Sequence, residues 1–346
     1  MSERQLKGVM IGAGFFGEFQ AEGWGRIPAV HLAAVADSVP GRAEAFAARH
    51  GIARSYTDAR EMLAAEKPDF ADIVTRPDSH VELTRIAAQC CPAVICQKPM
   101  ASTWNECRQM VEDCARAGAR LLIHENWRWQ PWYREIKRLL EAGRLGRVFQ
   151  VGFRMRTGDG RGPEPYQIQP YFRAMERLLL YETVVHFLDT FRFLAGEMST
   201  VFCQTQRINP VIRGEDCALV QVSFARGAKG LIDANRISGA FPPEIAFGEL
   251  RIEGERAMAR VAPDGNIFVT EYGQPEAVHS FTLSNQALSK QGYRGDSVKA
   301  LQEHCAECLL TGAQAESEGA DYLRTAEAVY ACYRSAETGQ PVGLAK

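Results

Sequence analysis

The sequence Val9-Met10-Ile11-Gly12-Ala13-Gly14-Phe15-Phe16-Gly17 joins a short apolar run to the start of a helical pattern. Its glycines have the spacing G-x-G-x-x-G. The first glycine permits a tight turn, the second lets a ligand approach the backbone, and the third lets a helix pack against a strand. Because N–H groups at a helix N-terminus bind anions, the stretch predicts a pyrophosphate-binding loop. The residues expected to bind the ligand here are Gly12, Gly14, Phe15, Phe16 and Gly17.

Short apolar runs alternate with helical patterns on both sides of this loop, up to about residue 125. Strands separated by helices predict a doubly wound parallel sheet, so residues 1–125 are expected to form an α/β dinucleotide-binding domain. The expected strands are 9–11, 31–36, 70–74, 93–96 and 120–123, with helices at 16–26, 42–50, 81–90 and 104–117 between them.

An acidic residue, Asp37, directly follows the second expected strand and lies twenty residues after Gly17. A carboxylate at this place can accept hydrogen bonds from both hydroxyls of the adenosine ribose, and it would repel a 2′-phosphate. The position therefore favours NAD over NADP, although Arg42 follows closely enough to keep NADP as an alternative.

The pattern changes after Asn126, where strands follow one another without intervening helices. This predicts an α+β domain over residues 126–346, built on an open-faced and mainly antiparallel sheet. Two closing helices, 297–310 and 320–338, have no sheet of their own to cover, and the sequence leaves open on which domain they pack. The expected strands are 148–155, 201–208, 218–225, 229–237 and 247–253, with helices at 132–142 and 178–194.

Composition excludes several classes of protein. The chain has 346 residues, 46% of them hydrophobic and 24% charged, with a formal net charge of −2, which offers no general attraction to nucleic acid or to an anionic membrane. The longest apolar stretch, 178–195, contains charged residues that a transmembrane helix rarely accepts. Ten cysteines without framework spacing favour the cytoplasm and free thiols.

One cysteine pair, Cys305 and Cys308 beside His304, has the spacing of half a zinc site. No second Cys/His pair follows it, so packing on a helix face is the favoured interpretation and no metal is expected.

Lys98 follows the expected strand 93–96, within the sequence Gln97-Lys98-Pro99. Ligands of open α/β sheets bind at the carboxyl ends of strands, so Lys98 is expected near the cofactor. The alternative for this residue type is an ordinary solvated lysine.

Glu182 and His186 are four residues apart on an expected helix and therefore share one of its faces. A carboxylate there would stabilise an imidazolium, which suits a histidine that accepts a proton. A purely structural Glu–His pair is the alternative.

Together these features resemble the Gfo/Idh/MocA family of sugar and cyclitol oxidoreductases. The similarity runs through the glycine loop, Arg76-Pro77-Asp78-Ser79-His80, Gln97-Lys98-Pro99, the Glu182–His186 pair and Ser335-Ala336-Glu337-Thr338-Gly339. The resemblance implies a Rossmann domain, NAD(P) as cofactor, and homodimers or homotetramers built through the face of the second sheet. It also implies Lys98 and His186 as catalytic residues with Glu182 in support.

Two positions depart from the family pattern. Many members have Glu-Lys-Pro where this chain has Gln97-Lys98-Pro99, and many have Asp at the position of Glu182. The first change removes a charge beside Lys98, and the second gives a longer acid that could reach a substrate hydroxyl. The further cofactor-binding residues that the resemblance implies are Ser38, Arg42, Thr75, Arg76, Pro77, His80, Gln97, Lys98 and Asn126.

The implied reaction is the oxidation of a secondary or lactol hydroxyl of a small unphosphorylated sugar. We expect His186 to remove the hydroxyl proton while the Lys98 ammonium holds the same oxygen, so that the two side chains converge on one hydroxyl. Polar and aromatic groups would give specificity. The expected substrate-binding residues are Lys98, Trp127, Arg128, Gln169, Tyr171, Glu182, His186 and Asn235.

The segments 126–130 and 169–172 are similar to a subgroup that oxidises aldoses, which favours a substrate such as D-apiose. Three alternatives remain open from the sequence. They are a cyclitol dehydrogenase acting on inositol, a glycosidase that cycles a bound NAD, and a sugar-responsive regulator that binds NAD without turnover. The presence of both Lys98 and His186 argues against the regulator.

Overall fold

A computed structural model of the chain describes residues 4–239, 245–280 and 292–345. The chain forms two compact units, each assembled from two segments of sequence. The first contains Met1–Trp129 and Ser289–Ala326, and the second contains Gln130–Leu288 and Glu327–Lys346. Each unit is described by itself below.

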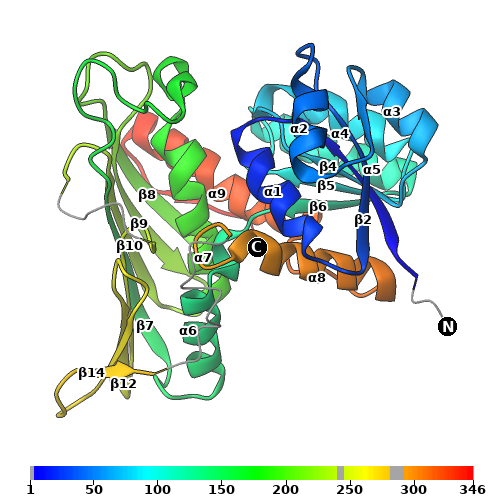
Figure 1. Cartoon of the computed structure of the whole chain (residues 1–346). Coiled ribbons are helices and arrows are strands. Elements are labelled where there is room, and N and C mark those ends of the chain that lie inside the picture. The colour runs from blue at the N-terminus through cyan, green and yellow to red at the C-terminus, as the bar shows by residue number, and fades with distance from the viewer. Residues whose placement is uncertain (1–3, 240–244, 281–291, 346) are drawn as a thin grey trace. The chain divides into compact units, whose positions relative to one another are not determined.

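The first unit is built on six parallel strands, as the alternating pattern predicts (Figure 1). Their order is β3-β2-β1-β4-β5-β6. Successive strands are added on one side of β1 up to β3 and on its other side from β4 onward, and ligands of such sheets bind at this switch point. The doubly wound Rossmann prediction is therefore confirmed. The strands are β1 (Leu6–Ile11), β2 (Val30–Ala36), β3 (Arg54–Tyr56), β4 (Phe70–Ile73), β5 (Ala93–Gln97) and β6 (Arg120–His124).

Helices form two groups around this sheet. One group contains α1, α2 and α8, and the other contains α3, α4 and α5. Strand β3 and helix α3 were not predicted from the sequence. Strand β3 is three residues long and has no buried position to produce an apolar run. The helices are α1 (Phe15–Gly25), α2 (Arg42–His50), α3 (Ala59–Glu66), α4 (His80–Ala88), α5 (Trp104–Ala117) and α8 (Ser297–Thr311).

The structure resolves the question of where helix α8 packs, which the sequence left open. Gln302 of α8 donates a hydrogen bond from Nε2 to the carbonyl of Gln20 in α1, at 3.0 Å. Leu301 and Cys305 lie in the core of the first unit. The boundary between the units falls inside the next helix, α9 (Gly319–Thr338).

The second unit contains a nine-stranded sheet of order β14-β13-β12-β11-β7-β10-β9-β8-β15. Among the described strands of this sheet, β7 and β10 pair in parallel and the other pairs are antiparallel, so the predicted mainly antiparallel sheet is confirmed. Its strands are β7 (Val148–Arg156), β8 (Met198–Gln206), β9 (Cys217–Phe224), β10 (Lys229–Asn235), β11 (Glu249–Gly254), β12 (Ala257–Val261), β13 (Ile267–Glu271), β14 (Ala277–His279) and β15 (Val342–Gly343).

Helices α6 (Pro131–Glu141) and α7 (Val185–Ala195) belong to the same unit as this sheet (Figure 1). The ring of Phe187 in α7 stacks on Phe153 of β7, with 3.9 Å between the ring centroids. Side chains alternate along each strand, so the opposite face of the sheet carries Leu219 and Leu231, which are 44% and 45% exposed. One face is therefore packed and the other is open.

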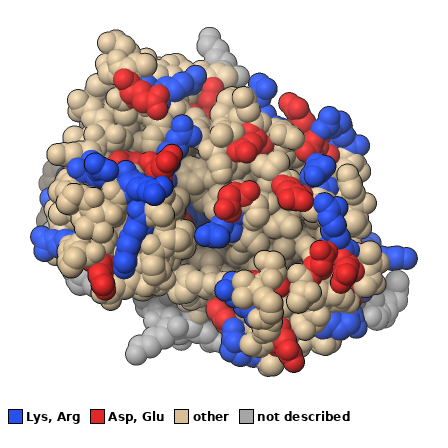
Figure 2. All heavy atoms as spheres, turned by 90° about the horizontal axis from the view of Figure 1, so that it is seen from above, with Lys and Arg blue, Asp and Glu red and all other residues tan. Residues whose placement is uncertain are grey.

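Charged side chains of both signs lie next to one another over the face seen in Figure 2, consistent with the small net charge. Among residues 4–239, 245–280 and 292–345, no helix combines the length and the apolar character that crossing a membrane requires.

Candidate active site

The glycine loop joins β1 to α1, and each of its three glycines meets a different steric requirement. Gly12 has φ +107, and a Cβ there would lie 2.7 Å from the carbonyl oxygen of Val74. A Cβ on Gly17 would lie 3.2 Å from the carbonyl oxygen of Gly12, so this glycine lets the helix approach the turn. Gly14 has no heavy atom within 4 Å of its Cβ position. The open space lies at the N-terminus of α1, as an approaching pyrophosphate requires.

Asp37 follows β2 and fixes the glycine loop. Its Oδ2 accepts a hydrogen bond from the Ala13 amide at 2.9 Å, and its Oδ1 accepts one from Val39 at 2.9 Å. The guanidinium of Arg42 lies 3.6 Å from Oδ1. The carboxylate therefore organises the loop in addition to the ribose contact expected of it, and Ser38 beside it is exposed.

The connection that follows β4 carries the segment from Thr75 to His80. The hydroxyl oxygens of Thr75 and Ser79 are 2.7 Å apart. His80 is fully buried, with Nε2 3.2 Å from the Thr75 carbonyl and Nδ1 3.0 Å from the Pro99 carbonyl. Burial lowers its pKa, which favours the neutral ring. The imidazole thus joins the β4 connection to the residues after β5, while Arg76 and Pro77 lie between these anchors.

Lys98 is the first residue beyond the carboxyl end of β5. Its amide donates to Oε1 of Gln97 at 2.8 Å, and the Lys98–Pro99 peptide bond is cis. The Gln97 amide nitrogen lies 2.9 Å from Oε1 of Gln20 and 3.3 Å from Nδ1 of His124. The side chain expected to bind cofactor therefore also holds the backbone of the expected catalytic lysine.

A buried carboxylate, Glu125, organises the segment that follows β6. Its Oε1 accepts the Trp127 amide at 3.0 Å, and its Oε2 accepts the Tyr322 hydroxyl at 3.1 Å. The side chain of the adjacent Asn126 donates to the Ser297 hydroxyl at 2.8 Å, at the start of α8. The anchoring role of Glu125 was not predicted from the sequence, because a lone glutamate beyond a strand gives no local sign of burial.

Arg128 contacts the connection between α8 and α9, and Trp129 contacts α8 itself. Arg128 is buried and donates to the carbonyl of Glu316 at 3.3 Å. The Trp129 ring packs on His304 of α8, with 4.7 Å between the ring centroids. These contacts favour structural roles for both residues, and a substrate contact of Arg128 stays a prediction.

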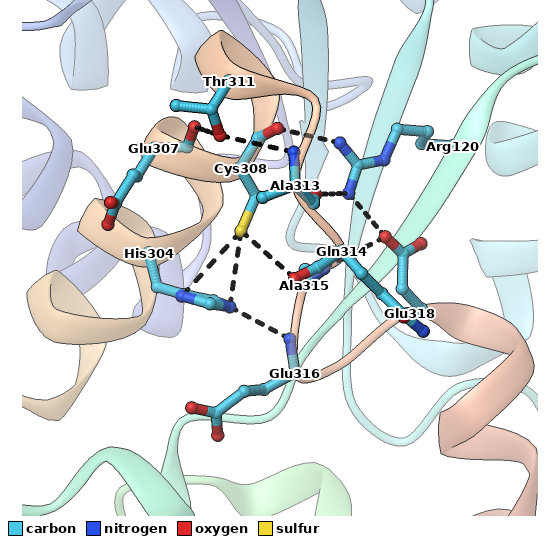
Figure 3. A network of polar contacts seen from close by, with 10 residues as sticks. All are labelled: Arg120, His304, Glu307, Cys308, Thr311, Ala313, Gln314, Ala315, Glu316 and Glu318. Carbon is cyan, nitrogen blue, oxygen red and sulfur yellow. Dashed lines mark hydrogen bonds and ion pairs between the residues drawn. The ribbon is translucent and has the colours of Figure 1, made fainter.

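Figure 3 shows how that connection is held. The His304 ring accepts a hydrogen bond from the Glu316 amide through Nε2 at 3.0 Å, and this nitrogen lies 3.6 Å from the Cys308 sulfur. Arg120 of β6 donates to the carbonyls of Cys308 and Ala313 at 3.0 and 2.8 Å. Within the described residues, no group of three or more His, Cys, Asp and Glu side chains could hold a metal.

In the second unit, the helix expected over 178–194 begins as a π-helix, Leu179–Val184, and continues as α7. Such segments often occur at functional sites. Glu182 lies on the π-helical part and is partly exposed, whereas His186, in the first turn of α7, is buried. The apolar pattern of the sequence predicts one continuous α-helix and contains no local sign of the π-helical start.

A second buried carboxylate, Glu215, fixes the start of the π-helical segment. Its Oε1 accepts the Leu180 amide at 2.9 Å and the Tyr333 hydroxyl at 2.7 Å, and its Oε2 accepts the Leu178 amide at 3.2 Å. The Tyr333 oxygen in turn accepts the Tyr181 amide at 3.2 Å. Glu215 thus satisfies amide groups that a helix start leaves without partners.

A buried arginine, Arg236, contacts the same segment. It donates to the Thr183 hydroxyl at 2.6 Å and to Oδ2 of Asp159 at 2.5 Å. Its guanidinium lies 5.3 Å from the ring centroids of both Tyr166 and Phe172. The loop that carries these aromatic residues is therefore joined to the helix of Glu182 and His186.

The remaining expected substrate residues lie in two places of the second unit. Gln169 donates from Nε2 to the Tyr171 hydroxyl at 2.9 Å, and Tyr171 is 39% exposed. Asn235 lies on the same sheet face as Leu231, opposite the face packed by α7, and its Oδ1 accepts the amides of Ile237 and Ser238. Contacts of these three residues with a substrate stay predictions.

The glycine loop generates a prediction with a matched control. Gly14→Ala is expected to leave the unfolding temperature unchanged, because φ is −87 and the space is open, but to weaken NADH binding at least roughly tenfold by filling the anion site. Gly25→Ala, at the other end of α1 and equally open, should change neither property. Gly12→Ala should destabilise the fold by about 2–4 kcal/mol. Thermal unfolding and NADH fluorescence titration measure the effects, and unchanged NADH affinity in Gly14→Ala would contradict the assignment.

Removal of the Glu215 carboxylate is expected to destabilise the second unit. Glu215→Ala leaves buried amides and a buried hydroxyl without an acceptor and should lower the free energy of unfolding by about 2–4 kcal/mol. Glu215→Gln should lower it by a smaller amount, because the glutamine amide still has one acceptor oxygen. The midpoint of urea unfolding, followed by circular dichroism, measures the change. Glu164→Ala, at an exposed position of the same unit, is the control. Equal midpoints for Glu215→Ala and Glu164→Ala would contradict the anchoring role.

Comparison with known proteins agrees with this geometry. A model of the oxidoreductase family with NAD-binding Rossmann fold matches residues 6–125, and the model of that family's C-terminal alpha/beta domain matches residues 137–344. D-apiose dehydrogenase of Rhizobium rhizogenes is 32% identical over 99% of both chains, and that of Paraburkholderia graminis is 33% identical over 99% of this chain and 90% of its own.

The fold has a near match among solved structures. A crystal structure of an oxidoreductase from Agrobacterium radiobacter, in complex with NAD⁺, L-tartaric acid and magnesium, has a TM-score of 0.90 and 32% identity, with 98% of each chain covered. The range matched by the family's NAD-binding domain, residues 6–125, contains Gly14, the N-terminus of α1 and Asp37. The chain therefore belongs to the Gfo/Idh/MocA family of NAD-dependent oxidoreductases.

Proposed function

We propose that this protein oxidises a hydroxyl of a small unphosphorylated sugar with NAD, and that an aldose such as D-apiose is its substrate. The observation that carries the proposal is the position of Lys98, one residue beyond β5, at the edge of the sheet where such folds bind their ligands. The full-length similarity to two D-apiose dehydrogenases supports the choice of substrate.

In this proposal, Lys98 and His186 act on the same substrate oxygen. The Lys98 ammonium donates a hydrogen bond to that oxygen and stabilises alkoxide character as the proton leaves. His186 accepts the hydroxyl proton, and Glu182, four residues before it, stabilises the imidazolium. NAD, when bound, supplies the hydride acceptor. Asp37 favours NAD because a 2′-phosphate would meet a carboxylate already held by two amides.

The experiment is a panel of sugars and polyols assayed for NADH formation by absorbance, with NAD and NADP in separate reactions. D-apiose, other aldoses, lactols, inositols and uronates form the panel. Turnover with aldoses and NAD supports the proposal, and exclusive turnover with inositols replaces it by a cyclitol dehydrogenase. Sugar release from glycosides without net NADH would indicate a cycling glycosidase, and NADH binding without any turnover would indicate a regulator.

Variants of the two proposed catalytic residues should lose activity but retain cofactor. Lys98→Ala and His186→Ala are each expected to lower kcat by roughly two to four orders of magnitude, with NADH affinity changed much less. Lys299→Ala and His31→Ala remove the same residue types at positions outside the proposed site, both in the first unit, and should remain active. Wild-type turnover by either Lys98→Ala or His186→Ala would end the assignment.

We also propose that the open face of the second sheet mediates homodimer or homotetramer formation. Leu219 and Leu231 lie on neighbouring strands of this face and are both nearly half exposed. Leu219→Glu with Leu231→Glu is expected to shift the protein to monomers in size-exclusion chromatography with light scattering. Val278→Glu introduces the same charge on strand β14, at the far edge of the sheet, and should leave assembly unchanged. Assembly that survives the double substitution would place the interface elsewhere.

A further inference from the structure

A chain of buried polar side chains lies behind Lys98. Asp72, in the middle of the buried strand β4, is fully buried, as are Gln20 of α1 and His124 of β6, and Gln97 is 5% exposed. The hydrogen-bonded chain runs from the Asp72 carboxylate through the side-chain amides of Gln20 and Gln97 to the backbone of Lys98, and His124 lies beside Gln97. Neither Asp72 nor Gln20 was predicted from the sequence to have a role.

When Asp72 is ionised, every hydrogen bond in the chain has a defined direction, because a carboxylate can only accept. Gln20 donates from Nε2 to both oxygens of Asp72, at 2.8 and 2.7 Å, and Trp24 donates its indole N–H to Oδ2 at 2.7 Å. The Gln20 amide nitrogen must therefore face Asp72, and its Oε1 must face Gln97.

The orientation of Gln20 in turn fixes the orientation of Gln97. The Gln97 nitrogen donates to Oε1 of Gln20 at 2.9 Å, so the Gln97 oxygen faces the other way and accepts the Lys98 amide at 2.8 Å. The Gln97 nitrogen also lies 3.3 Å from Nδ1 of His124, which fits a ring that accepts through Nδ1. Burial raises the pKa of Asp72 to about 7 in spite of its donors.

We propose that Asp72, Gln20 and Gln97 form a relay that positions Lys98 through its backbone amide, with the carboxylate of Asp72 setting the orientation of the two side-chain amides. Asp72 is a positioning residue in this scheme, and it acts on Lys98 only through the two amides. The inference rests on the proposed function where catalysis by Lys98 is concerned.

A reversal of the relay shows why the orientation of the two amides matters. With Asn at position 72, Gln20 can turn to accept from the new amide, but its nitrogen then faces the nitrogen of Gln97. If Gln97 also turns, its nitrogen faces the Lys98 amide, so the mismatched contact reaches Lys98. With Glu at position 97 and Asp72 unchanged, Gln20 is left between two carboxylates and can donate to only one of them.

Both substitutions together remove the mismatch. In Asp72→Asn/Gln97→Glu, Gln20 turns, accepts from the amide at 72 and donates to the carboxylate at 97, which still accepts the Lys98 amide. His124 can move its proton to Nδ1 to match, because its Nε2 has no hydrogen-bond partner among the described residues. The double variant thus carries the glutamate-lysine-proline sequence of many relatives with the relay reversed.

The test is a double-mutant cycle read by steady-state kinetics, NADH fluorescence titration and thermal unfolding. We expect Asp72→Asn and Gln97→Glu each to lower kcat roughly ten- to hundredfold, with smaller changes in KM and NADH affinity. The double variant should recover to within a few-fold of wild type. A purely structural role of Asp72, as an anchor for Trp24, would give no recovery of kcat on adding Gln97→Glu.

A matched control separates orientation from net charge. Asp69→Asn/Gln97→Glu has the same net charge as the double variant, but the Asp69 carboxylate accepts hydrogen bonds from Arg4 and the Lys7 amide, outside the relay. The relay would be overturned if Asp69→Asn restored the kcat of Gln97→Glu, or if the kcat of Asp72→Asn/Gln97→Glu were no higher than that of the less active single variant. If the wild-type protein oxidises no member of the sugar panel, the proposed function fails independently of the relay. The unfolding temperatures of the same double-mutant cycle then test the relay, because coupling between positions 72 and 97 would make the two changes in unfolding temperature non-additive.

Discussion

Parallel strand pairing in the first unit is the constraint on which the rest of this protein depends. The order β3-β2-β1-β4-β5-β6 brings the carboxyl ends of all six strands to one edge. Residues far apart in sequence, including Gly12, Asp37, Thr75 and Lys98, therefore follow strands that end together. Each strand end is a place where the backbone stops pairing with its neighbours and becomes free to bind a ligand.

Carboxylates hold the functional segments in both units. Asp37 accepts the Ala13 amide of the glycine loop, buried Glu125 accepts the amide of the turn after β6, and buried Glu215 accepts amides at the start of the helix that carries Glu182 and His186. A carboxylate that accepts several N–H groups fixes a loop more strictly than apolar packing, because each bond has a direction. The same physics explains how Asp72 can act at a distance through Gln20 and Gln97.

The departure from the family pattern at Gln97 acquires a physical meaning in this light. Read from the sequence, it is the loss of a charge next to Lys98. In the structure, the amide oxygen of Gln97 accepts the Lys98 backbone N–H, as a carboxylate oxygen would. The amide nitrogen of Gln97 donates to Gln20, which in turn donates to Asp72 of β4. An acidic side chain is thus present behind Lys98, on β4 and shielded from water.

The sequence by itself determined the Rossmann domain, the glycine loop, the position of Asp37 after β2, the position of Lys98 beyond β5 and the mainly antiparallel second sheet. These follow from local patterns: apolar runs of strand length, glycine spacing and an acid at a fixed distance. It could not determine the packing of α8 on α1, the π-helical start before α7, or the partners of Asp72, Glu125 and Glu215. Those depend on contacts between residues tens to hundreds of positions apart, which only the tertiary structure decided because no local pattern records which buried donor will meet which acceptor.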